Sequence, residues 1–367
     1  MVDRVRRLSS SEALALWRKA DTTELKARAR AVRNRFHSPK TATYTIMRIV
    51  NFTNVCVAQC DYCAFYVLPG HPGGYVLGLD EIFSRIDELL SLGGDLLGFN
   101  GGFNPDLTLD FYCDTFREIR RRYGEWIEFY ALTVAEFLYL ADRARLTYDE
   151  CARRLRDAGV LWITGGGAEI LTEDFRLRHS RLKYSVEEFF EAQRALIRNG
   201  LRTTATMVIG FDESLEERIE HLERIRDFQD EVGGALYSFL VWTYKPLHTA
   251  LGGREISDEE YLRHVALCRA FLDNIRHIRV SVLTRNETAL RALDYGADDF
   301  DLPIEDEVTE KAGAVIEKDL ESLLSRVRKL GYSPVYRRTP RCPRSQDCDS
   351  SSEGSARTVS RKGVGVE

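Results

Sequence analysis

An apolar run leads directly into three closely spaced cysteines in the stretch Tyr44-Thr-Ile-Met-Arg-Ile-Val-Asn51-Phe-Thr-Asn54-Val55-Cys56-Val-Ala-Gln-Cys60-Asp-Tyr62-Cys63. Its first part, Tyr44 to Val55, is rich in β-branched and aromatic residues and predicts a strand. Cys56, Cys60 and Cys63 then share one short loop, where three thiolates can hold three irons of a [4Fe-4S] cluster. Electron-carrying clusters normally have four cysteines, so here the fourth iron stays open to a small molecule.

The alternatives for this loop are a structural zinc site and cysteines without a common ligand. Structural zinc normally joins two hooks of paired thiol or imidazole ligands, and the sequence offers no second hook near the loop. Cys113, Cys151 and Cys268 lie in helical patterns, which favours the role of small buried hydrophobes. Cys342 and Cys348 flank a polar stretch near the C-terminus and lack further ligands for a metal. The cluster is the favoured interpretation.

Strand-like and helix-like runs alternate from residue 44 onward, which is typical of a parallel sheet with crossover helices. The predicted strands are residues 44–55, 95–100, 126–132, 160–164, 202–210, 236–242, 277–283 and 299–304. The predicted helices are residues 79–92, 109–123, 135–143, 148–158, 185–199, 215–231, 258–274, 287–295 and 317–330. The pattern predicts an α/β fold of the (β/α)8 TIM-barrel type, with its chemistry in the loops that follow the strands.

We expect three regions along the chain. Residues 1–43 should form an N-terminal helical extension that lies across the bottom of the barrel. Residues 44–339 should form the barrel domain. Residues 340–367 are rich in Ser, Arg, Gly and Asp and predict a disordered tail.

Composition and charge favour a small-molecule partner. The 52 basic and 57 acidic residues give a net charge of −5, so neither nucleic acid nor an anionic membrane is indicated. The sequence has no run of 18 apolar residues, and its N-terminus lacks the apolar core of a secretory signal. Eight cysteines in 367 residues, three of them clustered, indicate a reducing compartment. We therefore expect a cytoplasmic protein.

Glycine-rich segments follow the second and fourth predicted strands. In Asn100-Gly101-Gly102-Phe-Asn104, adjacent glycines would let a ligand approach the backbone closely. In Thr164-Gly-Gly-Gly-Ala-Glu169, the carboxylate is suited to accept hydrogen bonds from hydroxyl groups or to bind an ammonium. The ordinary alternatives are a tight turn and a carboxylate at a helix N-terminus. Because the carboxyl ends of barrel strands share one face, we expect both segments beside the cysteine loop.

Two later segments also follow predicted strands. Asp212 precedes Glu216 and Glu217, where capping and favourable charge in a first helical turn are the ordinary explanation. Trp242-Thr-Tyr244-Lys245 supplies aromatic faces and a cation, suited to stack on a base or bind an anion. Packing at the top of the barrel is the alternative for this segment.

Several segments together carry a family resemblance. They are Asn51-Phe-Thr-Asn54, Cys63-Ala-Phe-Tyr66, Pro69-Gly-His71-Pro-Gly-Gly-Tyr75, Gly101-Gly-Phe-Asn104-Pro105-Asp106, Gly165-Gly-Gly-Ala-Glu169-Ile-Leu, Thr203-Thr-Ala-Thr-Met207, Arg224-Ile-Arg-Asp-Phe-Gln-Asp230 and Trp242 through Leu251. With the cysteine spacing, they make residues 44–339 resemble the radical S-adenosylmethionine (SAM) enzymes. Within these, the sequence is similar to the menaquinone (futalosine pathway) and F0 synthase group, and most of all to its cyclic dehypoxanthinyl futalosine synthase branch.

The resemblance implies a [4Fe-4S] cluster on Cys56, Cys60 and Cys63, with SAM bound at the open iron. The implied SAM-binding residues are Tyr62, Phe65, Tyr66, Gly101, Gly102 and Glu169, and position alone makes Thr133 and Arg194 further candidates for the same pocket. In this group an electron from the cluster splits SAM, and the 5′-deoxyadenosyl radical removes a hydrogen from a sugar carbon, which then attacks an aromatic ring. The resemblance thus implies radical carbon–carbon bond formation on a small molecule, with a one-electron reductant such as flavodoxin or ferredoxin as partner.

The sequence departs from the family pattern at the ends of the third, fifth and seventh strands. Tyr130 and Phe211 stand where the group has histidines, Asp212 follows Phe211, and a Trp-containing segment is replaced by the run that ends at Arg285. Barrel enzymes contact substrate at such positions, so the candidate catalytic residues are Asp212, Tyr130 and Arg285. Two hypotheses therefore stand beside the group's own reaction. One is a divergent paralogue with a different nucleoside-like or aromatic substrate, and the other is a non-catalytic iron-sulfur or zinc-binding protein.

Overall fold

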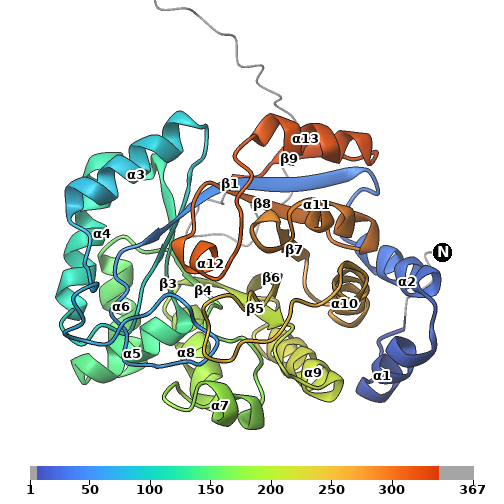
Figure 1. The fold of residues 1–367 in the computed structure, drawn as a ribbon, viewed down its shortest axis with the longest axis horizontal. Coiled ribbons are helices and arrows are strands. Elements are labelled where there is room, and N and C mark those ends of the chain that lie inside the picture. Colours follow the sequence, from blue (N-terminus) through green and yellow to red (C-terminus); the bar gives the residue numbers. More distant parts are fainter. Residues whose placement is uncertain (1–5, 339–367) are drawn as a thin grey trace, which may run out of the picture.

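A closed barrel of parallel strands forms the centre of the computed structural model, which describes residues 6–338 (Figure 1). The sheet order is β2-β3-β4-β5-β6-β7-β8-β1, and pairing of β1 with β2 closes the ring. The barrel strands are β1 (Thr41–Asn51), β2 (Leu96–Asn100), β3 (Glu128–Thr133), β4 (Trp162–Thr164), β5 (Arg202–Ile209), β6 (Leu236–Thr243), β7 (His277–Ser281) and β8 (Asp299–Pro303). The predicted (β/α)8 fold is confirmed.

Helices surround the barrel (Figure 1). They are α3 (Leu79–Ser91), α4 (Leu109–Tyr123), α5 (Val134–Ala144), α6 (Tyr148–Asp157), α8 (Val186–Arg198), α9 (Leu215–Glu231), α10 (Asp258–Phe271), α11 (Val282–Arg291) and α13 (Leu320–Lys329), with short 3-10 turns η1 (Gly124–Trp126) and η2 (Ala292–Tyr295). Capping boxes begin four of them, including Ser185 with Glu188 at α8 and Ser214 with Glu217 at α9. Among the helices of residues 6–338, none has the length and apolar character needed to cross a membrane.

The seventh unit differs from its prediction. Strand β7 ends at Ser281, whose side chain accepts a hydrogen bond from the Leu283 amide, and α11 begins directly after it. The expected strand continued to residue 283 and the expected helix began at residue 287. Asn286, with φ 44° and ψ −127°, is not helical and divides α11 into two pieces, so Arg285 ends a short first turn and the second piece begins at residue 287, as predicted.

Three short elements were not predicted: α7 (Glu173–His179), α12 (Glu307–Lys311) and β9 (Ser333–Tyr336). Strand β9 pairs in parallel with Thr41–Tyr44 of β1, below the part of β1 that pairs with β2. Local periodicity cannot show such a pairing, because the partners are far apart in the sequence. The expected tail, residues 340–367 with Cys342 and Cys348, lies outside the described residues.

The N-terminal extension consists of α1 (Ser10–Lys19) and α2 (Thr22–Arg33). These helices pack on the outer face of α9 and α10 (Figure 1), where Leu25 and Ala29 of α2 are buried against Ala266. The expected placement across the bottom is therefore wrong for the two helices. The apolar side of α2 has its partner on α10, while its last residue, Arg33, and the connection to β1 reach that end of the barrel through the Ala297 carbonyl oxygen and Asp298.

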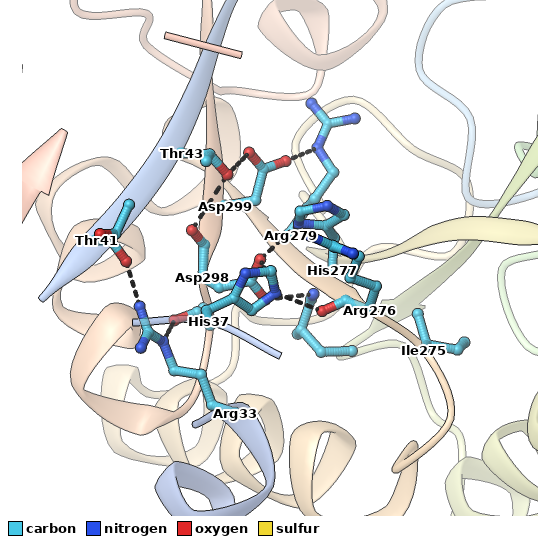
Figure 2. Close-up of polar contacts among 12 residues, drawn as sticks. Arg33, His37, Thr41, Thr43, Ile275, Arg276, His277, Arg279, Asp298 and Asp299 are labelled. Atoms are coloured by element: carbon cyan, nitrogen blue, oxygen red, sulfur yellow. Dashed lines mark hydrogen bonds and ion pairs between the residues drawn. The ribbon is translucent and has the colours of Figure 1, made fainter. Parts of the chain in front are cut away.

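A cluster of hydrogen bonds holds this connection (Figure 2). His37 Nε2 lies 2.8 Å from the Arg276 carbonyl oxygen and 3.1 Å from Asp298 Oδ2. His277 Nδ1 also lies 2.7 Å from Asp298 Oδ2, and Arg269 donates to Asp298 Oδ1 at 2.5 Å. Asp298 thus joins the connection to the amino-terminal ends of β7 and β8.

Candidate active site

The carboxyl ends of the barrel strands surround a cavity of about 360 Å³. Cys56, Cys60 and Cys63 line it, and Met47 and Ile49 of β1 extend its wall into the barrel. This is the face on which barrel enzymes carry their active sites. The predicted metal loop therefore opens into a space large enough for small molecules.

The loop that carries the cysteines is braced by a fixed set of hydrogen bonds. Asn54 Nδ2 donates to the Gly73 carbonyl oxygen at 2.9 Å, and Asn54 Oδ1 accepts from the Tyr75 amide at 2.9 Å. The Val57 amide donates to the Phe103 carbonyl oxygen at 3.1 Å, which ties the loop to the segment after β2. The position of the thiols is therefore set by two neighbouring segments.

The environment of the thiols suits metal-bound sulfur. The Cys56 Sγ atom accepts hydrogen bonds from the amides of Phe103 at 3.2 Å and Ala58 at 3.4 Å. Burial raises the pKa of Cys60 to about 11 and also raises the pKa of Cys63. Thiols with such pKa values are protonated at neutral pH unless a metal takes the place of the proton.

The spacing of the thiols distinguishes a cluster from a single ion. One ion needs ligand atoms gathered within a few ångströms, and in residues 6–338 such a group of three, all within 4.8 Å, is formed by His37, His277 and Asp298. The three cysteine sulfurs are spread more widely than this. Three separate iron ligands fit the thiols better than one zinc ion.

The paired glycines after β2 have a packing role. A Cβ on Gly102 would lie 2.3 Å from the Val55 carbonyl oxygen and 2.6 Å from the Cys56 Cβ. Gly101 lines the cavity, but its amide already donates to Glu136 Oε1 at 2.7 Å. The cysteine loop thus fills the space beside the Gly102 Cα, and the contact of the two glycines with SAM stays a prediction.

Glu136 is a buried carboxyl group beside the cavity. Its Oε2 accepts from the Thr133 amide at 2.8 Å and from Thr133 Oγ1 at 2.7 Å. Burial raises the pKa of Glu136 to about 7. Thr133 lines the cavity as expected, but its hydroxyl is already engaged in capping α5. The capping box Thr133-x-x-Glu136 was a visible signal for this pair.

Glu169 lines the cavity and forms an ion pair that was not predicted. Lys183 Nζ lies 3.2 Å from Glu169 Oε2 and donates to the Tyr62 hydroxyl at 3.0 Å. Glu169 has a positive φ of 43°, a left-handed conformation that is uncommon for a residue other than glycine. Glu169, Lys183 and the Tyr62 hydroxyl thus meet beside the cysteine loop.

Aromatic rings form the outer wall. The Phe211 ring centroid lies 5.2 Å from Tyr62 and 4.6 Å from Tyr244. Tyr62 and Tyr66 line the cavity, whereas Phe65 is buried and is not among the residues that line it, with Lys311 Nζ lying 5.1 Å from its ring centroid. That these three residues border an adenine stays a prediction.

Two predicted catalytic residues do not line the cavity. Asp212 is half exposed and lies 2.7 Å from His179 Nε2, which links it to Asp61 of the cysteine loop. Arg285 is buried on α11 and donates to the Ile256 carbonyl oxygen at 2.7 Å. Both side chains brace loops, so the structure places them outside the cavity lining, and their contact with a substrate stays a prediction.

Of the two remaining predicted site residues, Tyr130 lies at the cavity and Arg194 does not. Tyr130 lines the cavity and is 3% exposed, packed on Trp162 with a centroid distance of 5.1 Å. Arg194 lies on the outer side of α8 and pairs with Glu231 at 2.6 Å and Glu187 at 2.8 Å. Its assignment to the SAM pocket is corrected, because the barrel wall separates this face of α8 from the cavity.

Several cavity-lining polar residues escaped sequence reasoning. They are Glu136, Lys183, Arg279 and Asp306. Burial raises the pKa of Asp306 to about 6, and Thr309 Oγ1 donates to its carboxyl group. Two of these residues had a signal in the sequence. Glu136 belongs to a capping box, and Arg279 is a charged residue within an apolar strand. No spacing rule pointed to Lys183, which reaches the cavity from the segment between α7 and α8.

Known proteins share this sequence and fold. Residues 50–225 match the model of the Radical SAM superfamily, and residues 233–346 match that of the CofH/MqnC C-terminal region. The cyclic dehypoxanthine futalosine synthase of Halalkalibacterium halodurans is 38% identical over 91% of this chain and 90% of its own length. The aminodeoxyfutalosine synthase of Thermus thermophilus is 33% identical over 90% of this chain and 91% of its own. The crystal structure of methylornithine synthase has the same fold, with a TM-score of 0.68 at 17% identity, over 91% of this chain and 96% of that one.

The superfamily consists of enzymes that use a [4Fe-4S] cluster and SAM. The three thiols, their spacing and the adjoining cavity fit those groups, so the non-catalytic alternative is set aside. The family models together span most of the barrel, and the relatives match it from end to end. The chain therefore belongs to the radical SAM enzymes.

Proposed function

We propose that this enzyme converts dehypoxanthine futalosine to cyclic dehypoxanthinyl futalosine. The observation that carries the proposal is the 38% identity, over 91% of the chain, to a protein named for that product. The cavity supports it, because it combines a cluster loop, aromatic walls and polar groups in one enclosed space. In the proposed reaction a sugar carbon loses a hydrogen atom and bonds to the aromatic ring. The ring is restored by loss of one proton and of one electron, which the oxidised cluster would take back.

The chain's own residues bind, orient and shield in this reaction. When bound, the cluster supplies one electron and SAM supplies the group that removes the hydrogen atom. Cys56, Cys60 and Cys63 would hold the cluster. Glu169 and Lys183 offer one acceptor and one cation to the polar end of SAM. Phe211, with its aromatic neighbours, excludes water from a carbon-centred radical.

The partner and location follow as parts of the same proposal. A one-electron reductant such as flavodoxin or ferredoxin would deliver the electron, and such reductants are cytoplasmic. We propose that the enzyme works in the cytoplasm with a small-molecule substrate and without nucleic acid or membrane.

Anaerobic reconstitution tests the function. The reduced enzyme with SAM and dehypoxanthine futalosine should yield 5′-deoxyadenosine and the cyclised product in parallel, measured by liquid chromatography and mass spectrometry. Cys60→Ala should abolish both products, because it removes an iron ligand. Cys151→Ala, a buried cysteine on α6 away from the cavity, is the matched control and should retain both. Absence of cyclised product from a cluster-loaded enzyme that cleaves SAM would overturn the substrate assignment.

A second candidate is a divergent paralogue that acts on a different nucleoside-like or aromatic substrate. It is favoured by Tyr130 and Phe211, which line the cavity at positions where the family resemblance expects histidines. The same reconstitution separates the two, since this candidate predicts SAM cleavage that dehypoxanthine futalosine does not accelerate.

A further inference from the structure

A buried arginine lines the cavity from inside the barrel. Arg279 on β7 is 3% exposed, and its Nε lies 2.8 Å from Asp299 Oδ2 (Figure 2). Its Nη2 donates to Thr45 Oγ1 at 3.2 Å. Nε itself is fully buried and forms no hydrogen bond of good geometry, and within residues 6–338 no hydrogen bond reaches Nη1. Because guanidinium donors beside a cavity require partners, Nη1 offers a site for a bound molecule.

The other cations of the cavity wall are already paired. Lys183 lies 3.2 Å from Glu169, and Lys245 lies 2.7 Å from Glu255. Glu169 has no second cation among its contacts in the described residues, whereas Glu255 also lies 4.0 Å from Arg285. The carboxylate nearest Arg279 is shared more closely, with a second guanidinium that forms two hydrogen bonds to it.

Asp299 is that shared carboxylate. Arg337 donates to it twice, through Nη2 at 2.7 Å and Nε at 3.1 Å, and Thr43 Oγ1 donates at 2.6 Å. Although burial opposes ionisation, Arg337 and Arg279 hold the pKa of Asp299 below its usual value. Two guanidinium groups therefore bind one carboxylate.

Asp301, the second carboxylate near Arg279, does not form a hydrogen bond with its guanidinium group. Its Oδ2 accepts from Ser281 Oγ at 2.6 Å, and its Oδ1 lies 3.6 Å from Arg279 Nη2, beyond hydrogen-bond distance. Among the described residues, no hydrogen bond joins the Nη atoms of Arg279 to a carboxylate.

Arg337 enters the barrel from outside the eight strands. It directly follows β9, and its amide donates to the Tyr44 carbonyl oxygen at 2.8 Å, which extends the pairing with β1. Its guanidinium lies 5.3 Å from the Tyr237 ring centroid, and the residue is 9% exposed. The pairing of β9 thus carries a cation to the amino-terminal end of the barrel interior.

We propose that Arg279 binds a carboxylate of the substrate through its free Nη1, and that Arg337 is a positioning residue that holds Arg279 through Asp299. The proposal rests on the proposed function, since it concerns the substrate of the same cavity. Charge-assisted bonds of this kind discriminate strongly between an anion and a neutral group of the same shape. The apolar wall at Met47 and Ile49 suits an aromatic ring that carries the carboxylate.

Benzoate and benzamide provide a matched pair of probes, because they have the same shape and differ in charge. Equilibrium dialysis with the cluster-loaded, SAM-bound enzyme measures the two dissociation constants without turnover. Arg279→Gln should raise the value for benzoate at least tenfold and that for benzamide less than threefold. A benzoate value within twofold of the wild type, in a folded variant that still cleaves SAM, would overturn the anion site. Equal weakening of both probes would also overturn it.

The positioning role has its own readout. Arg337→Gln should reduce the preference for benzoate over benzamide by about fivefold, and Arg337→Lys should restore part of it. The matched control is Arg338→Gln, because the Arg338 side chain is 60% exposed and lies 3.6 Å from Asp95 outside the barrel; it should leave the preference unchanged. Unchanged preference in a folded Arg337→Gln variant would refute the positioning role.

The outcome is separable from that of the proposed function. Arg279-dependent benzoate binding without cyclised product would leave the anion site standing and overturn the substrate. Formation of the cyclised product by an enzyme that binds benzoate and benzamide equally well would support the substrate and overturn the anion site.

Discussion

Gly102 offers the sharpest test of how the cysteine loop is positioned. A Cβ built on it would meet the Val55 carbonyl oxygen at 2.3 Å and the Cys56 Cβ at 2.6 Å, about 1 Å closer than ordinary contact. Neither neighbour is the far end of a flexible side chain, so relief requires movement of the loop backbone. Overpacking of this kind costs about 1–3 kcal/mol. Gly102→Ala should therefore displace Cys56 and lower cluster content.

Iron and sulfide analysis, with the absorbance of the reconstituted cluster, measures the effect. We expect Gly102→Ala to hold less than half of the wild-type iron and to unfold at a lower temperature. Gly78→Ala is the matched control, because Gly78 has negative φ and no atom within 4 Å of its would-be Cβ. A Gly102→Ala variant with full cluster content and wild-type SAM cleavage would refute the claim that this close contact sets the position of the thiols.

Three further predictions address the cavity, the helix layer and acid stability. Lys183→Met should weaken SAM binding about tenfold, since it leaves Glu169 buried beside the cavity without its cation, and equilibrium dialysis with unchanged affinity would contradict this. Arg194→Ala should leave the rate of SAM cleavage within twofold of the wild type, because its ion pairs lie outside the barrel; a larger loss would return it to the SAM pocket. His221 is buried, and its Nδ1 accepts a hydrogen bond from the Leu171 amide at 2.9 Å. Burial lowers the pKa of His221 to about 3 in the folded protein, so the fold holds the neutral imidazole. Below about pH 6.5 the unfolded chain takes up a proton that the folded protein does not, and this favours unfolding. Urea unfolding should show a loss of about 2 kcal/mol from this group between pH 6.5 and pH 5, and His221→Asn should remove that part of the pH dependence; an unchanged slope would exclude His221 as its source.

The elements that sequence reasoning found are those whose pattern is local. Helices such as α4 and α9 match their predictions because apolar periodicity and capping residues lie within each segment. Strand β9 was missed because it depends on pairing with Thr41–Tyr44 at the other end of the chain. The end of β7 was placed late because a single hydroxyl, Ser281, turns the chain into α11.

The residues of the candidate site also fall into those that a local sequence pattern could reveal and those that it could not. The cluster ligands were readable because three cysteines stand on one loop. The placements of Arg194 and Arg285 were not, because position along a helix does not show which face meets the cavity. The packing role of Gly102 was not readable either, because the cysteine loop that fills the space beside it comes from another part of the chain.

The sequence by itself determined the barrel, the cluster loop and the family, since each depends on periodicity or spacing within short segments. Tertiary structure alone decided which charges meet. The pairing of Lys183 with Glu169, and the sharing of Asp299 between Arg279 and Arg337, join residues from separate strands and loops. Coulomb and hydrogen-bond energies depend on distances of a few ångströms, and only the closed barrel brings these groups that near.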